Sequence, residues 1–227
     1  MIPKKIHYCW FGRGALPLEV KKYIKTWKKW LPDYELILWN EENFDIESNR
    51  YVKEAYEAKK FAFVSDYVRL HALYEQGGIY LDTDIEVLKP LDPFLQHPSF
   101  IGFETSEFVG TGVIGAVPQA NWIGRVLEEY QNRHFILEDG NFDLTPNPET
   151  ISKFLKKNYQ LQEVNRRQEL NGEITVYPLE VFCAKDWKTG KVTANTTTCT
   201  IHHFSGSWHS SSDRIKKKIK KWIGLYG

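Results

Sequence analysis

The chain has 227 residues, of which 42% are hydrophobic and 15% aromatic, with eight Trp and a formal net charge of +1. This length suits one domain with a sizeable core. The eight residues 214–221 carry +6, so the other 219 residues sum to −5. This balance argues against a nucleic-acid-binding body, which would show basic residues within the fold.

The expected elements alternate between strands and helices without a low-complexity linker. In chain order, the apolar patterns predict strands at 5–10, 34–39, 79–81, 100–104, 113–117 and 174–177, and helices at 18–30, 61–76, 122–132 and 149–158. The first strand, helix and strand are typical of a parallel sheet. We therefore predict an α/β fold.

Three widely spaced cysteines, Cys9, Cys183 and Cys199, indicate neither a disulfide framework nor a zinc cluster. The chain has no run of 18 apolar residues, and its N-terminus lacks the apolar region of a secretion signal. These features predict a cytoplasmic protein.

The most informative stretch is "GGIYLDTDIEV", residues 77–87, where Asp82 and Asp84 follow an apolar strand. Residues i and i+2 on an extended backbone point to the same side. Two adjacent carboxylates repel unless a cation lies between them, which favours a hard ion such as Mn²⁺ or Mg²⁺. A solvated turn is the alternative, since an Asp-x-Asp pair also arises by chance.

The helix expected before this strand carries a second charged pair. Asp66 falls on the apolar stripe with Phe63 and Leu70, and Arg69 follows one turn later. Arg69 can pair with Asp66 in a self-contained ion pair or reach a ligand phosphate. Both interpretations stay open at this level.

Four segments together resemble glycosyltransferase family 32, which is related to the glucosylating domains of large bacterial toxins. They are "IHYCW" at 6–10, "SDYVRL" at 65–70, "GGIYLDTD" at 77–84 and "HHFSGSW" at 202–208. The resemblance spans nearly the whole chain in the same order. It implies a GT-A type nucleotide-diphospho-sugar transferase fold, with a mixed, mostly parallel sheet flanked by helices.

The resemblance also implies a donor site. Trp10 would stack on uracil, with a core Trp as the alternative, and Tyr80 would lie near the diphosphate. Asp66 and Arg69 would bind the donor sugar hydroxyls and the diphosphate region. Asp84 would ligate the metal directly, and Asp82 would contact ribose or the metal through water.

The C-terminal motif would supply a third metal ligand and a donor to the leaving group. By the resemblance, His203 is the expected ligand and Trp208 donates its indole N–H to the diphosphate. In a strand-like "TIHHF" the two histidines face opposite ways, so only one can reach the site. His203 is preferred here over His202.

The implied reaction is transfer of a hexose with retention, from a UDP-sugar of galactose or glucose type, by a bacterial enzyme of capsule or cell-surface polysaccharide synthesis. Glu104 and Asp139 are weak candidates for a nucleophile, so front-face attack is favoured. The stretch "VGTGVIGA", 109–116, predicts either close approach to donor and acceptor or a tightly packed strand.

We place the transferase domain at 1–212 and predict that residues 213–227 form a separate C-terminal tail. Ile215, Ile219, Trp222 and Ile223 share one helical face and lysines fill the other. Such a basic amphipathic helix, 213–227, is typical of peripheral contact with anionic membranes. A lipid-linked saccharide or glycan acceptor would suit this contact; a solvated terminal helix is the alternative.

Two other function classes remain open. One is an Asp-x-Asp phosphatase of the haloacid-dehalogenase type, in which Asp139 and Asp143 would imitate a later acidic motif. That class normally carries Asp-x-Asp on its first strand, whereas roughly 80 residues precede it here. The other is a calcium-dependent sugar-binding module, suggested by the aromatic content.

Overall fold

The computed structural model describes residues 1–205, which build a seven-stranded sheet of order β2-β1-β3-β6-β5-β8-β7. Its strands are β1 (Lys5–Cys9), β2 (Glu35–Trp39), β3 (Gly78–Leu81), β5 (Ser99–Phe103), β6 (Val109–Ala116), β7 (Gln168–Leu170) and β8 (Ile174–Tyr177). Five strands point the same way, whereas β6 and β7 run antiparallel to their neighbours. The expected mixed, mostly parallel sheet is confirmed.

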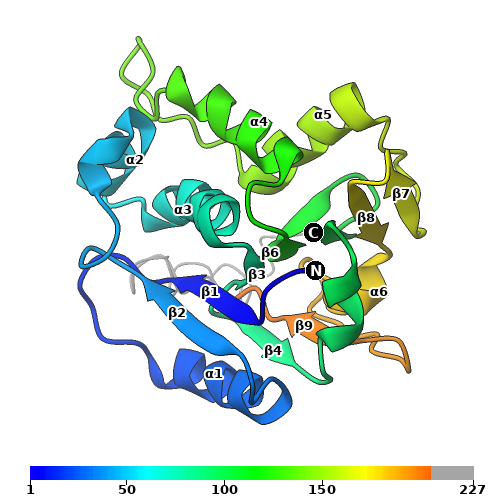
Figure 1. Cartoon of the computed structure of the whole chain (residues 1–227). Helices are drawn as coiled ribbons and strands as arrows, with labels where there is room; N and C mark the ends of the chain where they lie inside the picture. The colour runs from blue at the N-terminus through cyan, green and yellow to red at the C-terminus, as the bar shows by residue number, and fades with distance from the viewer. Residues whose placement is uncertain (206–227) are drawn as a thin grey trace.

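Helices cover one face of this sheet, and a helix with a small second sheet covers the other (Figure 1). On the first face lie α2 (Arg50–Glu57), α3 (Phe61–Gln76), α4 (Asn121–Gln131) and α5 (Asn147–Tyr159). On the second lie α1 (Leu18–Trp30) and the strand pair β4 (Ile85–Val87) and β9 (Thr200–His202). The short helices are η1 (Ile46–Ser48), η2 (Asp92–Gln96) and α6 (Leu179–Phe182). Each face buries its own apolar cluster, so the sheet lies between two core layers.

Helix α3 leads directly into the strand that carries the aspartates. It begins and ends at the residues that the apolar spacing predicts. Gly77 ends it with a φ of 60°, and its N–H donates to the Leu73 carbonyl. A Cβ at this position would lie 2.6 Å from the Pro118 ring, so both the backbone angle and the space require glycine.

Several elements differ from the sequence-based expectation, among them α2, β6, β7 and α6. Helix α2 was not predicted, although Asn49 is a recognisable N-cap whose Oδ1 accepts the Val52 N–H at 3.2 Å. Strand β6 is longer than the predicted 113–117 and includes all of "VGTGVIGA". The packed-strand interpretation of that stretch is therefore confirmed.

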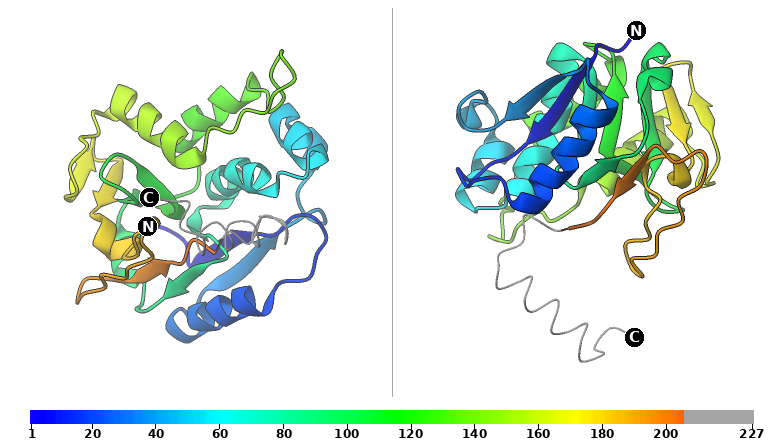
Figure 2. Two further views of the ribbon diagram at one scale, coloured as in Figure 1. Left: turned by 180° about the vertical axis from the view of Figure 1, so that it is seen from behind. Right: turned by 90° about the horizontal axis from the view of Figure 1, so that it is seen from below.

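Helix α1 fixes the segment that follows the aspartates. The buried Trp27 indole donates to the Ile85 carbonyl at 2.7 Å, and Thr26 Oγ1 accepts the Val87 N–H at 3.0 Å. Strand β4 then pairs antiparallel with β9, with Ile85 opposite His202. Figure 2, seen from below, shows this strand pair beside α1. As a result, the end of the described chain returns to the aspartates.

Candidate active site

The two aspartates lie in a tight turn at the carboxyl end of β3. The Asp82 N–H donates to the Gly112 carbonyl at 2.9 Å, and the Ile85 N–H donates to the Asp82 carbonyl at 3.0 Å. The backbone is therefore a turn rather than the extended segment that was expected. The turn is nevertheless not solvated, because Asp84 is only 8% exposed and the Asp82 side chain 24%.

His202 completes a three-residue group with these aspartates. One ligand atom from each of Asp82, Asp84 and His202 lies within 4.8 Å of the others, and His202 Nε2 is 3.3 Å from Asp84 Oδ1. His203 faces elsewhere, since its Nε2 is 2.8 Å from Glu86 Oε2 and its ring stacks on Tyr23. The structure therefore brings His202, and not the preferred His203, to the aspartates, and metal binding itself stays a prediction. The two rings do face opposite ways, but the β4–β9 register turns His202 toward the aspartates.

The charges within this group are unequal. Burial raises the pKa of Asp82, although the nearby Arg69 guanidinium and His202 both act to lower it. Burial also opposes ionisation of Asp84, but His202 and the Ser205 N–H at 2.7 Å hold the pKa of that carboxyl below its usual range. The pKa of His202 shifts the other way. Burial acts to lower it, but Asp84 outweighs burial and holds the pKa of the imidazole well above its ordinary value. Asp84 and His202 thus stabilise each other's charged forms.

Arg69 connects helix α3 to this turn. Its Nη2 lies 2.9 Å from Asp66 Oδ1 and 3.4 Å from Asp82 Oδ1. Its Nη1 donates to the Thr111 carbonyl and hydroxyl, and its Nε donates to the Ser65 carbonyl at 3.2 Å. All three nitrogens have partners in the chain, so the ion pair with Asp66 is present and extends to Asp82. A direct contact with a phosphate, as expected from the sequence, would require one of these bonds to break.

Asp66 is held in the same network and is 8% exposed. Burial raises the pKa of its carboxyl to about 6, although Arg69 acts in the opposite direction. The Asp66 carbonyl accepts a hydrogen bond from the Asn147 side chain at 2.9 Å, which ties α3 to α5. The predicted place of Asp66 beside Arg69 is confirmed, and its contact with donor sugar stays a prediction.

Tyr80 lies on β3, and Trp10 lies just beyond the end of the neighbouring strand β1. Tyr80 is buried, and its hydroxyl donates to Asp82 Oδ1 at 2.9 Å, so it orients that carboxylate. Trp10 directly follows β1, the parallel neighbour of β3, and is partly exposed while its indole N–H donates to the Gly14 carbonyl. A fully buried core Trp is therefore wrong for this position. The predicted stacking on a base stays a prediction.

Glycines of β6 form the wall of the site behind the aspartates and His202. A Cβ on Gly112 would lie 3.2 Å from Asp82 Oδ2 and 3.3 Å from His202 Nδ1. Glu104 and Cys183 lie on the other side of the His202 ring, within 4.8 Å of it by their ligand atoms. Sequence reasoning had noted the glycines and Glu104 but did not connect them with His202.

The donor set fits a divalent cation. Two carboxylates and one imidazole are ligands that Mn²⁺ and Mg²⁺ accept, and they converge at a strand end where α/β sheets bind ligands. Residues 17–101 match the family described as "Glycosyltransferase sugar-binding region containing DXD motif". The DXD motif within them is Asp82-Thr83-Asp84.

Two curated relatives of this chain come from fission yeast, Schizosaccharomyces pombe. The chain is 31% identical to inositol phosphoceramide mannosyltransferase 3 over 121 residues, which are 50% of this chain and 33% of that protein. It is 27% identical to inositol phosphoceramide mannosyltransferase 2 over 221 residues, which are 95% of this chain and 60% of that protein. The chain therefore spans about a third and about three fifths of these two relatives.

The fold is similar to that of a solved structure described as "PaToxG Glycosyltransferase". The TM-score is 0.51 at 17% sequence identity, and the match covers 69% of this chain and 68% of the other. Together with the mixed sheet, this similarity confirms the expected GT-A type fold.

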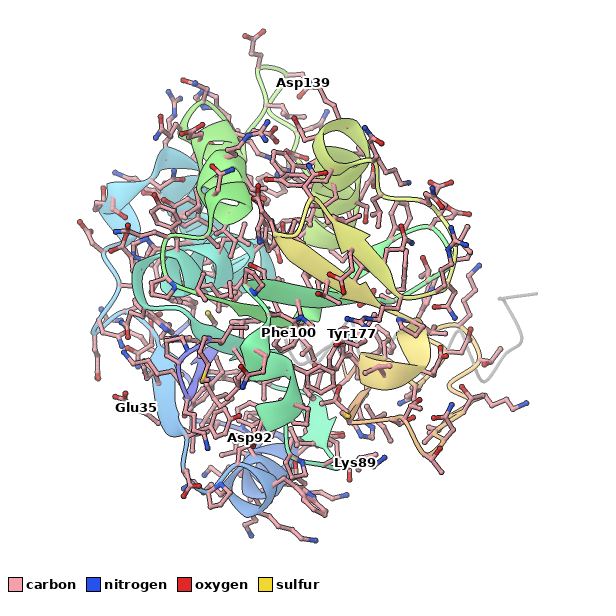
Figure 3. The ribbon with its side chains drawn as sticks, turned by 45° about the vertical axis from the view of Figure 1, so that its right-hand side comes forward. Glu35, Lys89, Asp92, Phe100, Asp139 and Tyr177 are labelled. Atoms are coloured by element: carbon pink, nitrogen blue, oxygen red, sulfur yellow. The ribbon has the colours of Figure 1, made fainter. Side chains whose placement is uncertain are left out.

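Asp139 and Asp143 do not lie with the DXD motif of the sugar-binding region. Asp139 lies on the exposed loop after α4, where its carboxylate accepts from Asn141 (Figure 3). Asp143 is paired with Arg133 at 2.8 Å. These positions favour neither the phosphatase alternative nor Asp139 as a nucleophile.

Three sequence-based expectations lie outside the described residues. They concern Trp208 as a donor to the diphosphate, the end of the transferase domain at 212, and the membrane-binding tail 213–227. Within residues 1–205, the helices are too short or too polar to cross a bilayer.

Proposed function

We propose that this protein is a metal-dependent glycosyltransferase that moves a hexose from a nucleotide sugar to a glycan or lipid-linked saccharide. The observation that carries the proposal is the convergence of Asp82, Asp84 and His202 at the end of β3, next to the sugar-binding region's own helix α3. A nucleoside diphosphate is the leaving group that such a cation site suits best.

A bound Mn²⁺ or Mg²⁺ would neutralise the negative charge that develops on the leaving diphosphate. Asp82, Asp84 and His202 would hold the cation. Tyr80 and Arg69 act one step further out, because both contact Asp82 Oδ1 and keep that carboxylate in place. These residues pre-organise the site before the donor binds.

For the donor, two observations support different sugars. The partly exposed Trp10 at the end of β1 supports stacking on uracil, and hence a UDP-sugar of galactose or glucose type. The names of the two fission yeast relatives support mannose. We propose a UDP-hexose as the donor, and an activity assay should test a mannose donor beside it.

Retention of configuration is part of the proposal, through front-face attack. The support is that Glu104 is engaged with His202 and that Asp139 lies on an exposed loop. Capsule or cell-surface polysaccharide synthesis, a cytoplasmic location and peripheral contact with the plasma membrane through 213–227 complete the proposal. Deleting 213–227 tests the last point, since unchanged binding to anionic vesicles would contradict it.

Calorimetric titration tests the central claim. UDP and GDP are titrated with and without Mn²⁺ into the wild-type protein and Asp84→Asn. We expect one nucleotide to bind only with metal, and to bind at least tenfold more weakly to Asp84→Asn, because the DXD carboxylate holds the cation. Absence of metal-linked nucleotide binding would contradict the proposal. Hydrolysis of a phosphate ester, or calcium-dependent binding of free glycan, would then favour the two other classes.

A further inference from the structure

Glu104 faces the candidate metal ligand His202. It directly follows β5, and its Oε2 lies 3.4 Å from His202 Nδ1. Both side chains are largely buried, with 17% and 13% exposed. Glu104 lies beyond the matched sugar-binding region, which ends at residue 101. Its contact with His202 joins segments nearly 100 residues apart.

Two glycines of β6 leave room for the Glu104 and His202 side chains. Gly110 and Gly112 lie two residues apart on this strand, and a Cβ on Gly110 would lie 2.9 Å from Glu104 Cβ and 3.1 Å from its Oε2. A Cβ on Gly112 would lie 3.3 Å from His202 Nδ1. The β5–β6 register also shifts between Ile101 and Gly102, just before Glu104. Larger residues at either glycine would displace Glu104 or the imidazole.

Both nitrogens of the His202 ring face carboxylates. Nε2 is 3.3 Å from Asp84 Oδ1, on the side of the DXD turn, and Nδ1 faces Glu104. Cys183 also borders the ring, but a thiol is a weak hydrogen-bond acceptor beside a carboxylate. Glu104 is thus the charged acceptor on the Nδ1 side.

A histidine that ligates a cation must give up one ring proton, which leaves one N–H and one lone pair. The acceptor near one nitrogen decides which nitrogen keeps the proton. We infer that Glu104 is a positioning residue that keeps the proton on His202 Nδ1 and thereby presents the Nε2 lone pair to a cation held by Asp82 and Asp84. This inference rests on the proposed function, because it assigns a second layer to the same metal site. Stacking of Phe204 on the ring at 4.0 Å supports the same orientation.

The chain contains a matched control for this pair. His203 Nε2 lies 2.8 Å from Glu86 Oε2, and this second Glu–His pair stacks on Tyr23 instead of facing the aspartates. Glu86→Gln therefore changes the same chemistry without touching the candidate metal ligands. Any effect common to both variants reflects general stability.

The experiment measures Mn²⁺ affinity by electron paramagnetic resonance of the free ion, with Mn²⁺ alone as the probe. We expect Glu104→Ala to weaken binding about 10- to 100-fold, the usual range for the outer partner of a ligating histidine. Glu104→Gln keeps an acceptor and should lose less, and Glu86→Gln should match wild type. In a His202→Ala background, Glu104→Ala should add no further loss.

A second readout follows the tautomer. Nitrogen-15 spectra of histidine with Mg²⁺ bound should show the His202 proton on Nδ1 in wild type and a mixture of tautomers in Glu104→Gln. Wild-type affinity and an unchanged tautomer in the Glu104 variants would overturn the inference, as would additive losses in the double variant. If Asp84→Asn and His202→Ala also bind Mn²⁺ as wild type does, the proposed metal site itself is wrong.

Discussion

Replacing His7 should flatten the acid dependence of stability. His7 lies on β1 and is fully buried; its Nε2 contacts the Gly77 carbonyl at 2.7 Å, while the Trp39 indole donates to its Nδ1 at 3.0 Å. With Nδ1 accepting, Nε2 must carry the single proton of a neutral ring. Burial lowers the pKa of His7 to about 4 from 6.5. The His7→Gln variant keeps a donor and an acceptor but does not titrate in this range.

The magnitude follows from the two pKa values. Between pH 6.5 and about 4, His7 binds a proton in the unfolded state but not in the folded state. The free energy of unfolding therefore falls as the pH decreases toward 4. The gap between 6.5 and about 4 corresponds to about 3 kcal/mol, at about 1.36 kcal/mol for each pH unit. Below about pH 4 both states are protonated, and this contribution to the slope ends.

The assay is urea unfolding followed by tryptophan fluorescence at several pH values from 7.5 to 4. We expect the free energy of unfolding of wild type to fall about 3 kcal/mol more than that of His7→Gln across this range. His134→Gln is the matched control, because the His134 side chain is 42% exposed. Parallel pH curves for wild type and His7→Gln would show that His7 is not held neutral by its burial.

Three further substitutions test the packing around the site. Arg69→Met removes the buried cation beside Asp82, and we expect a loss of about 3–5 kcal/mol in urea unfolding; a loss under about 1 kcal/mol would contradict the ion-pair network. Ser99→Ala leaves the buried Trp122 indole N–H without its acceptor, which should cost about 1–3 kcal/mol in the same assay, and no loss would contradict this contact. Gly112→Ala should weaken Mn²⁺ binding while the circular dichroism spectrum stays unchanged, because the added Cβ crowds Asp82; wild-type affinity would contradict the close packing.

Local patterns predicted much of the fold. The helices Leu18–Trp30 and Phe61–Gln76 have the predicted bounds because their apolar spacing and the Gly77 stop act within a few residues. Helix α2 was missed, although its Asn49 cap was a readable signal. The lengths of β6 and of other strands depend on their partners, which local spacing does not reveal.

The candidate site likewise has a part that local sequence predicts and a part that only tertiary packing decides. The sequence by itself determined that Asp82 and Asp84 leave the end of a strand and that Asp66 lies one turn from Arg69, since both relations span only a few residues. Alternation along 200–203 determined only that the two histidines face opposite ways.

The tertiary structure decided which histidine meets the aspartates. The register of β9 on β4 places His202 opposite Ile85, and a shift by one residue would have presented His203 instead. The structure also brought Glu104 onto His202 and placed Asp82 beside the Arg69–Asp66 pair. These contacts join residues far apart in the chain, so only the packing of sheet, helices and glycines fixes them.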